Sequence, residues 1–147
     1  CRALAEAPWC RPKERVRAEL IAVESYCWEG DARGAARAGD DFFAKYDGSE
    51  YIDQLASARL FVGIEVRSLK WHEQSAEHFR WIIQHAPEVP VRAYYELWIT
   101  LSRLGAPESE IQEVEDFLLA NYPDSPSARG IQIIKRQEAR GHVLNAR

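Results

Sequence analysis

The sequence lacks the features that mark three large classes of protein. It has no run of 18 or more apolar residues, and its longest apolar stretch, residues 60–64, is far too short to span a bilayer. Its 19 basic and 23 acidic residues are interspersed, with a net charge of -4. No Lys/Arg block is present, which argues against a nucleic-acid partner. With 46% hydrophobic residues, five Trp, six Tyr and five Phe, the chain is not compatible with wholesale disorder.

Motifs with a known catalytic mechanism are also missing. The sequence contains no P-loop, no Gly-x-Gly-x-x-Gly, no Gly-x-Ser-x-Gly and no Cys-x-x-Cys. His72 and His78 are six residues apart, which places them roughly 240° apart around a helix. His85 shares a face with His78, but two ligands alone make at most a weak metal site. We therefore expect no metal, no cofactor and no enzymatic activity.

Apolar residues recur at helical spacing from Pro12 onward. Val16, Leu20 and Val23 follow one helix face, and Gly30 is a typical helix stop. The same periodicity predicts seven helices and no strand, at about residues 12–29, 32–46, 52–70, 73–86, 91–104, 107–121 and 127–140. In the third of these helices, Arg59 is the only polar member of the apolar stripe.

Three segments at helix ends look alike, which indicates an internal repeat. They are residues 42–50 (FFAKYDGSE), 82–90 (IIQHAPEVP) and 118–126 (LLANYPDSP). Each has two large apolar residues, a polar shoulder and a turn. The chain is therefore expected to be a set of helix-turn-helix pairs with a period of roughly 34 residues, followed by one further helix.

These pairs resemble tetratricopeptide repeats. When Pro87 is set on that family's terminal proline, four residues fall on its characteristic small and apolar positions: Gly63, Ser75, Phe79 and Ile82. When Asp47 is set there, three residues fall on its tyrosine, turn glycine and alanine: Tyr26, Gly30 and Ala35. Pro123 anchors a third unit that departs from the pattern, because Glu115 stands where an aromatic is usual and Ile111 where alanine is usual.

The resemblance covers about residues 13–126 and implies an all-α fold. That fold is a right-handed superhelical array of about three helix pairs with a C-terminal capping helix. Residues 1–12 are expected to form a tether or arm, 13–141 the repeat domain and 142–147 a C-terminal tail.

The resemblance also implies a concave face that binds a peptide or a helix of another protein. In that register the concave positions are Arg17, Glu24, Trp28, Ile64, Arg67, Glu96, Thr100 and Arg103. The three arginines can pair with carboxylates, and Trp28 can anchor a partner. Against this, an arginine on a helix is usually only solvated, and a tryptophan usually belongs to the core.

The cysteines leave two interpretations open. Cys1, Cys10 and Cys27 are either three unrelated thiols, in a chain that starts at Cys1 by chance, or the trace of a processed lipoprotein. In the second case Cys1 carries lipid, and Cys10 and Cys27 form a disulfide in an oxidising compartment. Together with NYPDSPSA (121–128), Cys1 also resembles the periplasmic lipoproteins that help to assemble outer-membrane β-barrels.

The functional prediction is a non-catalytic scaffold that binds other proteins and helps to assemble or position a membrane-associated complex of the bacterial envelope. It is expected on the periplasmic or external face of a bacterial membrane, most simply the outer membrane, held by lipid on Cys1. A first alternative is a structural subunit embedded in a larger envelope assembly, with exposed apolar residues such as Trp9, Trp28 or Trp71. A second is a small enzyme or ligand-binding domain with a polar pocket enclosed among the helices.

Overall fold

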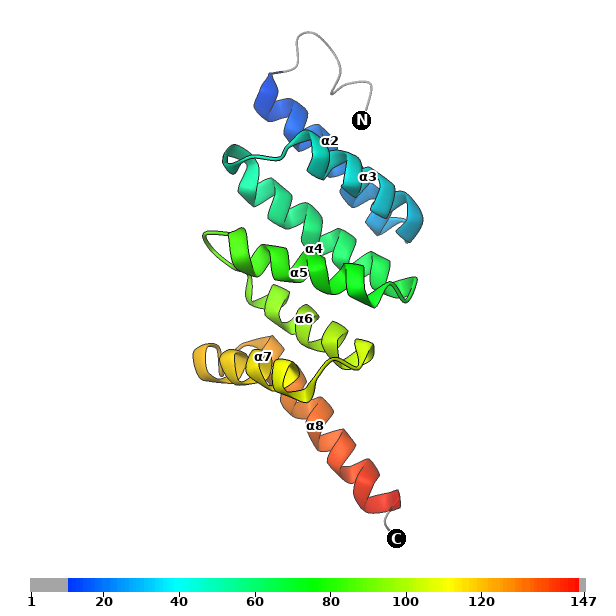
Figure 1. Ribbon diagram of the computed structural model, residues 1–147, viewed down its shortest axis with the longest axis vertical. Helices are drawn as coiled ribbons and strands as arrows, with labels where there is room; N and C mark the ends of the chain where they lie inside the picture. The colour runs from blue at the N-terminus through cyan, green and yellow to red at the C-terminus, as the bar shows by residue number, and fades with distance from the viewer. Residues whose placement is uncertain (1–10, 146–147) are drawn as a thin grey trace. The chain divides into compact units, whose positions relative to one another are not determined.

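The structure, a computed structural model, describes residues 11–145 and is all-α over that range (Figure 1). No strand occurs among these residues, and every predicted helix is present. The elements in chain order are α2 (Pro12–Trp28), α3 (Ala32–Lys45), the 3-10 turn η1 (Ser49–Tyr51), α4 (Ile52–Ser68), α5 (His72–His85), α6 (Val91–Leu104), α7 (Glu108–Asn121) and α8 (Pro126–Asn145). In residues 11–145 no helix is both long and apolar enough to cross a membrane.

Local chemistry explains where the helices begin and end. Pro12 occupies the first turn of α2, where its missing N–H is no loss. Gly30 follows α2 with φ 72°, a left-handed conformation that favours glycine. The Asp31 side chain then accepts a 2.9 Å hydrogen bond from the backbone N–H of Gly34, which caps the start of α3. Gly105 ends α6 in the same left-handed region, with φ 70°.

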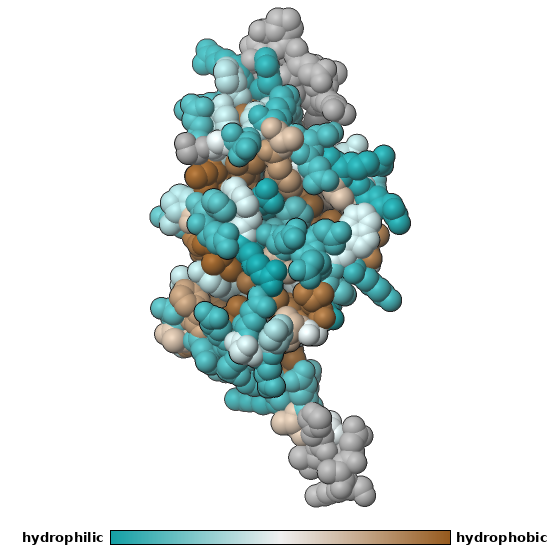
Figure 2. Space-filling view, in the orientation of Figure 1, coloured by the Kyte–Doolittle hydropathy of each residue, from teal (hydrophilic) through white to brown (hydrophobic). Residues whose placement is uncertain are grey.

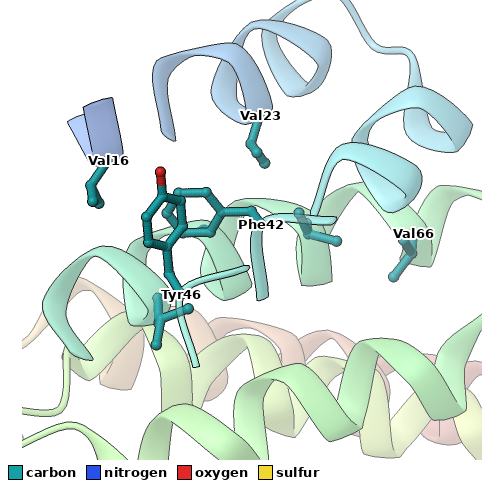
Figure 3. Close-up of a cluster of buried hydrophobic side chains, with 8 residues drawn as sticks. Val16, Val23, Phe42, Tyr46 and Val66 are labelled. Atoms are coloured by element: carbon teal, nitrogen blue, oxygen red, sulfur yellow. The ribbon is translucent and has the colours of Figure 1, made fainter. Parts of the chain in front are cut away.

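The chain divides into two compact units, Cys1–Val89 and Pro90–Arg147. In the first unit α4 is the central helix and packs against α2, α3 and α5. The core of this unit draws on three helices (Figure 3), and its buried members are Val16, Val23, Phe42, Tyr46, Leu55, Ala58, Val62 and Val66. A helix that contacts three neighbours needs apolar residues on more than one side, which accounts for the wide stripe of α4.

Small residues let the helices of the first unit approach one another closely. A Cβ atom at Gly39 would lie 2.9 Å from Val62, and one at Gly63 would lie 2.9 Å from the ring of Phe79. Ser75 also reaches Gly63, because its hydroxyl donates a 2.7 Å hydrogen bond to the Gly63 carbonyl oxygen. The small and apolar positions noted in the sequence thus mark the contact between α4 and α5.

The second unit packs α6 against α7 and α8. Trp98, Leu118 and Ile131 form its buried cluster. Glu115 is 5% exposed and forms an ion pair with Lys135 on α8. A buried carboxylate needs such a partner, so this ion pair joins α7 to α8 in the second unit.

Candidate functional site

One stripe of α2 leaves large side chains in solvent. Arg17, Ile21, Glu24 and Trp28 follow each other at spacings of four, three and four residues, so they share one helix face. Trp28 is 80% exposed and Ile21 is 43% exposed. A tryptophan with so little cover is unusual, because this side chain is highly buried on average.

Helix α4 continues this face, since it packs beside α2. The ring centroids of Phe61 and Trp28 are 6.4 Å apart, with the planes tilted by 44°. Ile64, three residues after Phe61, is half-buried. We call this surface the Trp28 face; its members are Arg17, Ile21, Glu24, Trp28, Phe61 and Ile64.

Polar residues surround the apolar ones over much of the surface. In Figure 2, brown hydrophobic areas are small and separated by teal hydrophilic side chains. The Trp28 face has the same mixed character, since along α2 the charged Arg17 and Glu24 alternate with Ile21 and Trp28. Such mixing of apolar anchors with a polar rim is typical of non-obligate interfaces.

Negative charge collects at the C-terminal end of α2. The helix has no basic residue in its last turn, and Glu29 is its C-terminal cap. Burial first, then the carboxylates of Glu65 and Glu24, raise the pKa of the Cys27 thiol to about 12. Both carboxylates therefore act on the end of α2 that carries Trp28.

The structure places the other predicted partner-binding residues differently. Arg67 is half-buried in the last turn of α4, and Arg103 is exposed in the last turn of α6. Glu96 and Thr100, which the prediction places on the partner-binding face, are only 5% and 0% exposed. They lie on the same stripe of α6 as the fully buried Ala93, which puts them in the interior.

Those two buried polar residues form hydrogen bonds within α6. Arg92 Nε lies 3.3 Å from Glu96 Oε1, and the Thr100 hydroxyl donates a 2.8 Å hydrogen bond to the Glu96 carbonyl oxygen. These contacts stabilise the helix itself.

Cys27 is a free, half-buried thiol in α2. Cys1 and Cys10 lie outside the described residues, so the lipid on Cys1 and the Cys10–Cys27 disulfide stay predictions.

A hollow of about 700 Å³ lies between α2 and α3. Its charged lining residues are Glu19, Glu29, Arg37, Asp41 and Lys45, and its aromatic ones are Tyr26 and Phe42. Lys45 and Glu19 form an ion pair across it. The mixture of signs gives the hollow no preference for a ligand of one charge, so it is a weaker candidate than the Trp28 face.

The histidines do not converge. His78 contacts Arg59, with 3.2 Å between Nδ1 and Nη1, and His85 stacks on Trp81 with centroids 4.6 Å apart. Within residues 11–145 no group of three or more His, Cys, Asp or Glu residues is placed to hold a metal ion. The contact of Arg59 with His78 was not predicted from the sequence. A single arginine in an apolar stripe does, however, indicate a buried cation with a specific hydrogen-bond partner.

Comparison with known proteins adds no relative. No protein-family model matches the chain, and neither a curated protein nor a solved structure matches it.

Proposed function

We propose that this chain is a non-catalytic scaffold that binds another protein through the Trp28 face. The observation that carries the proposal is the 80% exposure of Trp28 beside Phe61 and on the same stripe as the exposed Ile21. Covering a tryptophan and its neighbours removes a large apolar area from water, and tryptophan is enriched among the residues that dominate binding energy.

The proposed architecture is a tetratricopeptide-like superhelix with this face on its concave side. Support comes from the turn inside each helix pair, where Gly30, Lys70 and Gly105 all adopt positive φ. Further support comes from Ala35 and Phe79, which stand at family positions and are fully buried. The role in envelope assembly belongs to the same proposal but rests on sequence resemblance alone, and the binding face does not depend on it.

A site-specific crosslinking experiment tests the binding face. A photo-crosslinking amino acid is placed at position 21, and the native host is irradiated with and without the second change Trp28→Ala. We expect discrete adducts that fall at least tenfold with Trp28→Ala, because truncating a central aromatic anchor typically costs about 2 kcal/mol or more. The same crosslinker at the exposed Gln84 of α5 is the control and should give no such adduct.

The folding of the Trp28→Ala variant has to be verified in parallel. Because Trp28 is mostly exposed, its removal should change the free energy of unfolding by less than about 1 kcal/mol, which chemical denaturation can measure. Adducts from position 21 that are unchanged by Trp28→Ala, in a folded variant, would refute the proposed binding face.

The exposure of Trp28 also favours the alternative function, a structural subunit embedded in a larger assembly. An experiment therefore has to distinguish this alternative from a scaffold. Trp71 does not contribute, because it is half-buried against the first core and lies under the Arg33 guanidinium at 5.7 Å. Sedimentation of host extracts separates the two functions. A scaffold exchanges between free and bound pools, whereas an embedded subunit sediments only with its assembly.

A further inference from the structure

The C-terminal end of α2 carries acidic side chains, although the helix dipole favours basic side chains there. The C-terminal end of a helix carries a partial negative charge and is stabilised by basic side chains. Helices α4 and α6 follow this rule with Arg67 and Arg103 in their last turns. Helix α2 has none there, and its cap is Glu29. Helix α2 itself thus supplies no basic side chain against this partial charge.

Three carboxylates share this end of the helix. Glu24 is one turn before Trp28, Glu29 directly follows it, and Glu65 is one turn after Phe61. Among residues 11–145, none of the three side chains forms an ion pair. Two of them, Glu65 and then Glu24, raise the pKa of the Cys27 thiol after the larger effect of burial, so both act on the last turn of α2.

The Trp28 ring, at the same end of α2, can itself accept a cation. The faces of tryptophan rings attract guanidinium and ammonium groups. Two other tryptophans of this chain already hold an arginine: Arg59 lies 4.5 Å from the ring centroid of Trp81, and Arg33 lies 5.7 Å from that of Trp71. Trp28 is more exposed than either, and no described arginine or lysine lies over it.

We infer that the segment bound by the Trp28 face is basic, with a lysine or arginine side chain lying against Trp28 between Glu24 and Glu65. This inference rests on the proposed function and specifies its partner. The cation would neutralise the carboxylates and the end of the helix dipole together, which a neutral apolar segment does not do. An acidic segment would be repelled.

Titration with short peptides tests the inference on the whole chain. The probes are three eight-residue peptides of alternating sequence, Arg-Ala, Ser-Ala and Glu-Ala, followed through the ¹⁵N-indole signal of Trp28. We expect the Arg-Ala peptide to shift this signal saturably at low salt, at least tenfold more tightly than Ser-Ala, with no binding by Glu-Ala. Trp28→Ala should remove the saturable component.

A matched pair of variants separates the site from bulk charge. The double variant Glu24→Gln, Glu65→Gln should bind the Arg-Ala peptide at least fivefold more weakly than the unaltered chain. Glu108→Gln with Glu113→Gln removes the same charge from exposed positions on α7 and should weaken it less than twofold. Equal losses in both pairs would overturn the inference, as would equally tight binding of Ser-Ala.

Two further outcomes also count against a basic partner. A Trp28 signal that shifts with protein concentration in the absence of peptide would identify a second copy of the chain as the occupant. Loss of the crosslinked adducts in Trp28→Ala, together with no peptide preference, would overturn this inference while leaving the proposed scaffold function in place.

Discussion

Arg59 donates a hydrogen bond from Nη1 to Nδ1 of His78 over 3.2 Å, linking α4 to α5. The same guanidinium lies 4.2 Å from the ring centroid of Phe43 on α3 and 4.5 Å from that of Trp81 on α5. Since an arginine keeps its charge, Nδ1 of His78 has to be the acceptor, so the imidazole is neutral. Burial and then the Arg59 charge lower the pKa of His78 to about 4.

The pH dependence of stability follows from this contact. The unfolded chain protonates His78 near its ordinary pKa of 6.5, and the folded chain only near 4. The contribution of neutral His78 to the free energy of unfolding is therefore fully present above pH 6.5. It is lost as the pH falls toward 4, by roughly 3 kcal/mol in total. Urea denaturation at several pH values measures this loss. His78→Asn keeps an acceptor that does not titrate and should remove most of the slope. His85→Asn, at an exposed position, should keep it.

Lys70 is strained in a way that Gly30 and Gly105 are not. All three residues join the helices of a pair, with φ of 62°, 72° and 70°, but only Lys70 carries a Cβ. A non-glycine residue in this region costs about 1–2 kcal/mol. We expect Lys70→Gly to stabilise the chain by about 0.5–1 kcal/mol in denaturant titrations, after the greater flexibility of glycine when unfolded is subtracted. Lys70→Ala keeps the strain and should give no such gain.

Helix positions were predictable because the signals are local. The spacing of apolar residues predicted α4. Gly30 predicted the end of α2 and Pro107 the start of α7, without knowledge of any tertiary contact. Burial of individual faces was less predictable. Periodicity showed that Glu96 and Thr100 share a stripe, but whether that stripe meets solvent depends on elements distant in sequence, and it is in fact buried.

Only the local part of the candidate site was predictable from the sequence. Trp28 was expected on a binding face from repeat register, and its 80% exposure is what separates it from a core tryptophan. Its contact with Phe61 crosses 33 residues (61 − 28) and required the packing of α2 on α4.

The contact of Gly63 with Phe79 predicts a strong size dependence at that position. A Cβ atom at Gly63 would lie 2.9 Å from Phe79 Cε1, and Phe79 is fully buried, so the ring has no room to move aside. Gly63→Ala should destabilise the chain by about 1–2 kcal/mol, despite the better helix propensity of alanine. Gly141→Ala, with nothing within 4 Å, should be neutral or slightly stabilising. Equal effects in denaturant titrations would contradict the close packing of α4 and α5.

The Cys27 thiol should be a poor nucleophile in the folded chain. Its pKa of about 12, against 9.0 for a free thiol, leaves little thiolate at pH 8. With Cys1 and Cys10 replaced by serine, alkylation by iodoacetamide should be slower in the native than in the unfolded chain, by on the order of a hundredfold or more.

The dependence of the alkylation rate on pH distinguishes a raised pKa of Cys27 from simple steric protection of the thiol. If the pKa is raised, the native rate keeps climbing above pH 10, whereas a thiol that is only shielded levels off near 9. Glu65→Gln removes one of the two carboxylates that raise the pKa of Cys27, so it should speed the native reaction several-fold at pH 8. Glu77→Gln, exposed on α5, should leave it unchanged. An unchanged rate in Glu65→Gln would mean that the carboxylates around Trp28 do not act together, which would also weaken the case for a basic partner at that face.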